Sequence, residues 1–161
     1  MSKLAERRPT QASLYETDFY LWTQEQSRLL RERRFDELDL ANLVDEVRSV
    51  GGSERSQIES RLDVLIAHLL KWKYQPGART SSWMGTIVEQ RRRIARILGN
   101  SPSLRRYPAE VFEECYLAGR LEAAKESGID FSLFPEVAPF TVEQALDASY
   151  LPKEPGLLDQ S

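Results

Sequence analysis

Side chains that could do chemistry are scarce in this sequence of 161 residues, which has one histidine, His68, and one cysteine, Cys115. Histidine is the side chain that most often acts as a general acid or base near neutral pH, so an acid–base or metal-assisted site would have to include His68. Leu65, Leu69 and Trp72 flank it at helical spacing. This spacing places His68 at the edge of an apolar helix face, where we expect it to be half-buried.

Arg91 is the second residue whose position suggests a buried polar site. It falls among the apolar positions of a helix expected over 83–98, so its guanidinium should face inward. A buried cation without a counter-charge costs on the order of several kcal/mol, and Glu46 or Asp63 can supply the carboxylate. We therefore predict a candidate polar cluster that contains Glu46, His68, Arg91 and Glu89.

Two interpretations of this cluster remain open. In the first, its members line a pocket between helices and perform acid–base or metal-assisted chemistry. In the second, they form a satisfied polar network that fixes the register of the helices. The second is favoured because no residue is specified as a nucleophile.

Other signatures of catalysis or cofactor binding are missing from the sequence. It has no glycine-rich phosphate loop, no nucleophile elbow, no paired-cysteine metal motif and no pair of histidines at helical spacing. The single Cys115 excludes an internal disulfide and is typical of a cytosolic protein. We therefore assign no catalytic residue, no metal and no cofactor.

The elements that must position these residues are helices. Apolar residues recur every three or four positions in each long segment, and no stretch of six residues alternates apolar with polar, which predicts an all-α fold. We expect a single-domain, mainly up-and-down bundle of about five helices plus a short C-terminal helix. The expected helices span 18–34, 39–50, 53–75, 83–98 and 108–128, with caps at Thr17 or Asp18, Asp39 and Ser82 and a capping box at Thr141 and Gln144 for the last helix.

Gly51 and Gly52 decide whether the second and third helices are one rod or a hairpin. The apolar phase continues through the pair, which favours a rod, whereas two glycines and seven residues without an apolar side chain favour a turn or kink. A continuous helix would hold Glu46 and His68 about 33 Å apart. We expect a break, which would let the polar cluster form.

The folded domain is expected to cover 14–150, between mobile tails at 1–13 and 151–161. The N-terminal tail carries Arg7, Arg8 and Pro9 without periodicity, and the C-terminal one contains Pro152 and Pro155. Neither a secretory signal nor a run of about 18 apolar residues is present, so we expect a cytoplasmic protein with no membrane span.

The charges are unevenly distributed along the chain. The segment 64–109 carries nine basic residues and one acid, whereas the remainder has an excess of acids that brings the net charge to −3. Tryptophan and tyrosine residues are interleaved with the basic ones, a mixture that nucleic-acid surfaces use. Apart from Arg91, the candidate basic surface comprises Lys71, Lys73, Arg79, Arg92, Arg93, Arg96, Arg105 and Arg106.

Several short stretches together resemble a bacterial family known as domain of unknown function 29. The stretches are 15–22 (YETDFYLW), 34–39 (RFDELD), 67–72 (AHLLKW), 82–83 (SW), 89–94 (EQRRRI) and 101–104 (SPSL). The resemblance covers nearly all of the expected domain and implies an α-helical, bundle-like fold. It implies no activity and assigns no site residue.

Three functions are compatible with the sequence. The first is a cytoplasmic helical module that binds a protein partner or forms a homo-oligomer, which the uneven charge favours. The second is a nucleic-acid binder that uses the basic segment 71–106; the acidic isoelectric point argues against a general attraction to phosphate. The third is an enzyme, or a ligand or metal binder, that uses Glu46, His68 and Arg91.

Overall fold

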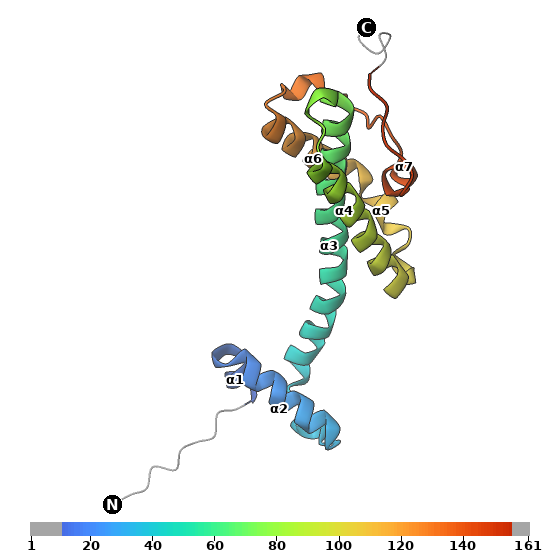
Figure 1. Ribbon diagram of the computed structural model, residues 1–161. Coiled ribbons are helices and arrows are strands. Elements are labelled where there is room, and N and C mark those ends of the chain that lie inside the picture. Colours follow the sequence, from blue (N-terminus) through green and yellow to red (C-terminus); the bar gives the residue numbers. More distant parts are fainter. Residues whose placement is uncertain (1–10, 156–161) are drawn as a thin grey trace, which may run out of the picture. The chain divides into compact units, whose positions relative to one another are not determined.

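The computed structural model describes residues 11–155, and within them every regular element is a helix (Figure 1). The all-α prediction is therefore confirmed. The expected tails fall largely outside the described residues, at 1–10 and 156–161, although residues 11–13 begin the first helix. The helices are α1 Gln11–Thr17, α2 Phe19–Arg31, α3 Leu40–Tyr74, α4 Ser81–Asn100, α5 Tyr107–Glu110, α6 Phe112–Ser127 and α7 Val142–Leu146, with short 3₁₀ turns η1 Phe35–Glu37, η2 Pro76–Ala78, η3 Pro102–Leu104 and η4 Phe131–Leu133.

The expected break at Gly51 and Gly52 is wrong, because α3 runs without interruption from Leu40 to Tyr74 (Figure 1). Each glycine weakens a helix by about 1 kcal/mol relative to alanine, but it keeps the N–H and C=O that continue the hydrogen-bond ladder. The long helical segments on both sides supply the cooperativity that carries the helix through this stretch.

Local signals account for most of the other helix boundaries. Asp18 caps α2, and Thr141 and Gln144 form the expected capping box of α7. Gly128 ends α6 with a φ of 72°, a conformation that glycine adopts without strain. Thr80, not the expected Ser82, caps α4. The helix expected over 108–128 is divided into α5 and α6 at Val111.

The chain divides into two compact units, one ending at Gly52 and the other beginning at Ser53. The expected domain 14–150 thus contains two units, and α3 contributes its first part to one and its second part to the other. Each unit is described below by itself.

Unit 1 contains α1, α2 and the first part of α3, and η1 lies between α2 and α3. Trp22, Gln26 and Leu29 are its buried side chains within the described residues. The indole nitrogen of Trp22 donates to Asp39 (3.1 Å), and the main-chain N–H of Asp39 donates to the Gln26 side chain (2.9 Å). These bonds connect α2 to the start of α3.

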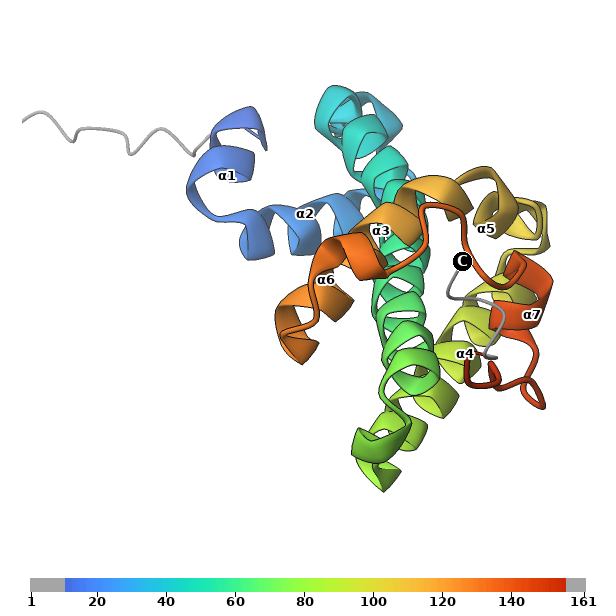
Figure 2. The same ribbon diagram turned by 90° about the horizontal axis from the view of Figure 1, so that it is seen from above.

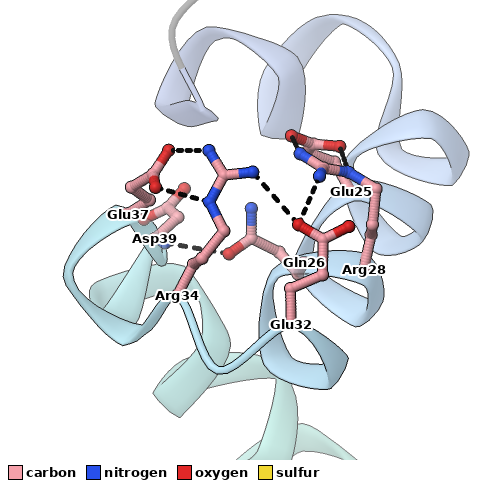
Figure 3. Close-up of polar contacts among 7 residues, drawn as sticks. All are labelled: Glu25, Gln26, Arg28, Glu32, Arg34, Glu37 and Asp39. Carbon is pink, nitrogen blue, oxygen red and sulfur yellow. Dashed lines mark hydrogen bonds and ion pairs between the residues drawn. The ribbon is translucent and has the colours of Figure 1, made fainter.

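A chain of ion pairs joins the end of α2 to the turn η1 (Figure 3). Arg28 bridges Glu25 and Glu32, each at 2.7 Å, and Arg34 bridges Glu32 and Glu37 at 3.1 and 2.6 Å. The side chains are about two-fifths exposed. Exposed pairs of this kind contribute little to stability, because water screens the charges, so the network orients the turn more than it stabilises the unit.

Unit 2 holds the main hydrophobic core, in which α6 packs against the second part of α3 (Figure 2). The two helices meet at Gly119, where an added Cβ would lie 2.7 Å from Ile66 Cγ2 and 2.9 Å from the Asp63 carbonyl oxygen. The fully buried side chains of this core include Ile58, Leu62, Leu65, Ile66, Leu69, Leu70, Ile87, Ala123 and Ala145.

The connector between α6 and α7 packs into this core through its phenylalanines. Phe134 and Phe140 are buried, and Phe134 meets the Tyr74 ring edge to face at 5.5 Å between centroids. The Tyr116 hydroxyl donates to the Pro135 carbonyl at 2.6 Å. A segment without long helices is thus held in place by aromatic side chains and by bonds to its main chain.

Candidate functional site

Arg91 is buried, with 6% of its surface exposed, as its place in the apolar pattern predicts. Its partners are not carboxylates: Nε donates to the Ala145 carbonyl at 2.7 Å and Nη2 to the Tyr150 carbonyl at 2.9 Å. Burial lowers the pKa of Arg91 from its usual value, partly opposed by the charge of Asp147. The residue therefore clamps the C-terminal segment onto α4.

Arg120 holds the connector between α6 and α7 in the same way, although it was not among the predicted site residues. It is buried, and its Nη2 donates to the carbonyls of Phe134 (2.7 Å) and Phe131 (3.3 Å). Its guanidinium also lies 3.9 Å from the centroid of the Phe131 ring. Arg120 lies at helical spacing from Tyr116, Leu117, Ala123 and Ala124, and this place among apolar positions is the sequence signal that could have identified it.

His68 is half-buried on α3, as expected, and its Nδ1 lies 2.9 Å from the Val64 carbonyl one turn earlier. Burial lowers the pKa of His68, an effect that the bond to Val64 opposes. On the same helix, the buried Lys71 donates to Glu126 of α6 and lies 4.8 Å from the centroid of the Trp83 ring. His68 thus adjoins a structural ion pair and does not adjoin Arg91.

Glu46 and Glu89 also have partners of their own. Glu46 accepts a hydrogen bond from the Tyr15 hydroxyl at 2.6 Å. Glu89 accepts from Arg92 at 2.9 Å and from Arg93, and these bonds lower the pKa of Glu89 to about 2. No described contact joins the four members of the predicted polar cluster. The physical reason is that α3 is continuous, so Glu46 and His68 lie twenty-two residues apart on one helix.

Cys115 is buried on α6, and its Sγ lies 3.8 Å from the Glu59 carbonyl. Burial, together with Asp63, raises the pKa of the Cys115 thiol well above its usual value. The thiolate is the reactive form of cysteine, so this side chain is a poor nucleophile. Among residues 11–155, no group of three or more histidines, cysteines and carboxylates has a geometry that could hold a metal ion.

The predicted basic surface is divided among separate contacts. Arg79 donates to the Trp72 carbonyl (2.8 Å) and to Glu154 (3.2 Å), and Lys73 donates to the Lys153 carbonyl (3.2 Å). These residues, like Lys71, attach other segments of unit 2. Arg105 and Arg106 are exposed next to η3. The structure brings Arg92, Arg93 and Arg96 together on one side of α4, where they line a hollow with Arg61.

This hollow lies between α3 and α4 in unit 2 and has a volume of about 300 Å³. At one end Arg61 donates to Gln90 (3.3 Å), and at the other Ser101 donates to Glu54 (2.5 Å). Arg61 was not part of the predicted basic surface, because it lies outside the basic segment and meets it only when α3 and α4 pack. The hollow is lined by Glu54, Gln57, Arg61, Arg92, Arg93, Arg96, Ile97 and Asn100.

A second unusual surface is the apolar face of unit 1. Leu40, Val44, Val47 and Val50 form an apolar stripe at helical spacing on α3, yet all four are exposed, Val47 to 72% and Val50 to 70%. Beside the stripe, a groove of about 310 Å³ separates α2 from α3 and is lined by Phe19, Trp22, Thr23, Gln26, Ser27, Leu30, Leu43 and Glu46. We call the stripe and this groove the apolar face.

Comparison with known proteins places the chain in a family. No described helix is long and apolar enough to cross a bilayer. No curated protein and no solved structure matches the chain. One family model matches residues 14–151, which include nearly all of both units and every residue of the hollow and of the apolar face. The chain belongs to the family described as Domain of unknown function DUF29.

Proposed function

We propose that this protein is a self-associating helical module, in which the apolar face of unit 1 packs against the same face of a second copy. The observation that carries the proposal is the exposure of Leu40, Val44, Val47 and Val50 on one side of a regular helix. A helix with an apolar stripe normally buries it, because that burial supplies most of its stability.

Unit 1 is too small to be stable through its own core. It buries Trp22, Gln26 and Leu29, and Gln26 is polar. Domains of about 40 residues usually need disulfides, metals or oligomerisation to fold. A small helical unit with an exposed apolar face meets this need by packing that face against the same face of a second copy.

The area of the apolar face suits a modest dimer. The four stripe residues, with Phe19 and Leu30 at the edge of the groove, each expose about half of their surface or more. Each therefore shows on the order of 80 Å² to water, and two copies would bury roughly 1,000 Å² of apolar surface. This is about the minimum for a specific interface, so we expect a concentration-dependent dimer.

The charges beside the stripe and the absence of a side chain at Gly51 favour an antiparallel pairing of the two α3 helices about Val47. In this register Val44 faces Val50 of the second copy, and Leu43 faces Gly51. The Arg48 side chain is 79% exposed and its nitrogen lies 4.0 Å from Asp45, and in this register it would lie near Asp45 of the other copy. A parallel pairing would instead set Gly51 against Gly51, with no side chain to fill the space between them.

Gly51 also suits this register. No atom lies within 4 Å of a Cβ added there, so the packing of the chain itself does not require glycine. Because Gly51 has no side chain, a second helix could approach α3 closely at this point of the stripe.

The test compares Val47→Glu with Val88→Glu by sedimentation equilibrium. Val88 is a matched control, because it is an exposed valine (53%) on a long helix of unit 2. Each Val47 side chain contributes about 1.5 kcal/mol to the interface, so the loss in both copies should weaken the dimer about a hundredfold. Val88→Glu should dimerise like the wild type. A wild-type chain that is monomeric at every concentration, or equal effects of the two variants, would refute the proposal.

Cysteine cross-linking tests the register, since the buried Cys115 does not compete. Under mild oxidation, Val47→Cys should form a covalent dimer by itself. Val44→Cys should form one only when mixed with Val50→Cys, because a disulfide needs Cα atoms within about 7 Å. Efficient cross-linking of Val44→Cys with itself would show a parallel pairing and contradict this register.

A further inference from the structure

The hollow between α3 and α4 is separate from the apolar face and is not used by the proposed dimer. Its residues come from one face of each helix: Glu54, Gln57 and Arg61 are spaced three and four apart on α3, and Arg93, Ile97 and Asn100 are spaced similarly on α4. All of them belong to unit 2. A single copy therefore forms the whole hollow.

Two of the four arginines that line the hollow have few or no described hydrogen-bond or ion-pair partners. Arg61 is half-buried, its one described bond is the 3.3 Å contact with the neutral Gln90, and its Nε is buried without a partner. Arg96 is exposed and has no ion-pair partner among residues 11–155. Positively charged side chains that gather without counter-ions repel one another, and an anion between them removes this cost.

The charged groups at the hollow include more guanidinium groups than carboxylates. Arg92 and Arg93 share the single carboxylate of Glu89. Glu54 is the acid that lines the hollow, and one of its oxygens accepts a bond from Ser101. Four guanidinium groups thus face two carboxylates, an excess of two positive charges. A phosphate group carries about two negative charges at neutral pH and offers three oxygens to arginine donors.

We propose that this hollow binds a small molecule through a terminal phosphate or diphosphate group, with Arg61 and Arg96 as its main ligands from α3 and α4. The volume of about 300 Å³ lies at the lower end of the range for small-molecule pockets. Gln57 and Asn100 supply neutral donors at the same hollow, as expected where oxygen acceptors are to be oriented.

A small ligand fits these observations better than a nucleic-acid strand. A strand needs a track of cations along its backbone, whereas Lys71, Lys73 and Arg79 are engaged in contacts within unit 2. The excess charge is confined to the hollow, and the chain as a whole carries a net charge of −3.

Isothermal titration of the full chain with inorganic pyrophosphate tests the proposal. We expect saturable binding with one ligand per chain. Arg96→Gln, which changes an exposed side chain, and Arg61→Gln should each weaken it about tenfold or more, because each removes a charge-assisted bond. Arg105→Gln is the matched control: it removes the same charge from an exposed position outside the hollow and should leave the affinity unchanged.

The outcomes separate this proposal from its alternatives. Absence of pyrophosphate binding, or equal weakening by Arg96→Gln and Arg105→Gln, would overturn it. Tighter binding of a single-stranded RNA of about twenty nucleotides, weakened alike by all three substitutions, would reassign the charge to nucleic acid and also overturn it. The Val47→Glu variant should bind pyrophosphate like the wild type, so failure of the dimer and failure of this site are distinguishable.

Discussion

Replacement of Gly119 by alanine tests the close approach of α6 to α3 on which unit 2 depends. The new Cβ would lie 2.7 and 2.8 Å from two atoms of Ile66 and 2.9 Å from the Asp63 carbonyl oxygen, whereas ordinary van der Waals contacts begin at 3.4 Å. A flexible side chain could rotate away, but a main-chain oxygen and a β-branched carbon cannot. The two helices must therefore separate by several tenths of an ångström.

The magnitude follows from two opposing effects. Overpacking of this kind costs typically 1–3 kcal/mol, and more when the backbone must shift, because the core loses contacts along the whole helix pair. Alanine recovers about 1 kcal/mol of helix propensity. We expect Gly119→Ala to lower the free energy of unfolding by about 2 kcal/mol, which corresponds to a decrease in melting temperature of about 6 °C for a chain of this size.

Gly85→Ala is the matched control, because Gly85 is also inside a helix and an added Cβ there meets nothing within 4 Å. It should stabilise the chain by roughly 0.5–1 kcal/mol. Urea unfolding followed by far-ultraviolet circular dichroism gives both free energies. Since the chain has two units, the alkylation rate of Cys115 in α6 serves as a second readout specific to unit 2. A Gly119→Ala variant as stable as the wild type would show that the approach of α6 to α3 is looser than described.

The other predictions concern titratable groups of unit 2. Burial lowers the pKa of His68 below its usual 6.5. The folded state therefore binds this proton less readily than the unfolded chain does. The stability contributed by neutral His68 is complete above pH 6.5 and is lost as the pH falls through the folded-state pKa. Between pH 7.5 and 5.5 the wild type should lose more unfolding free energy in urea titrations than His68→Gln, and identical slopes would contradict this. The raised pKa and the burial of Cys115 predict that the native protein reacts negligibly with iodoacetamide at pH 8 and that the protein unfolded in urea reacts rapidly. Mass spectrometry measures the labelling. Fast labelling of the native protein would argue against the burial of Cys115.

The sequence predicted well those features that depend on neighbouring residues. Asp18 caps α2, Thr141 and Gln144 form a capping box, and Gly128 ends α6, because in each case a side chain or a missing Cβ acts within one helical turn. The inward position of Arg91 was also predictable, since it follows from helical periodicity alone.

The partners of the polar residues could not be read in the same way. Arg91 was expected to need a carboxylate, but the Ala145 and Tyr150 carbonyls satisfy it, and main-chain acceptors leave no mark in a sequence. The continuity of α3 through Gly51 and Gly52 rests on a balance of about 2 kcal/mol between helix propensity and cooperativity, which residue types do not resolve.

The described hydrogen bonds of His68 and Arg91 go to main-chain carbonyls, whereas the hollow and the apolar face are lined by other residues. Periodicity and capping by themselves determined an all-α protein and the approximate extent of its helices, since these signals act over a few residues. Tertiary structure alone decided that Leu40, Val44, Val47 and Val50 stay exposed and that Arg61 joins Arg96, because burial and charge clustering depend on which helix faces pack together.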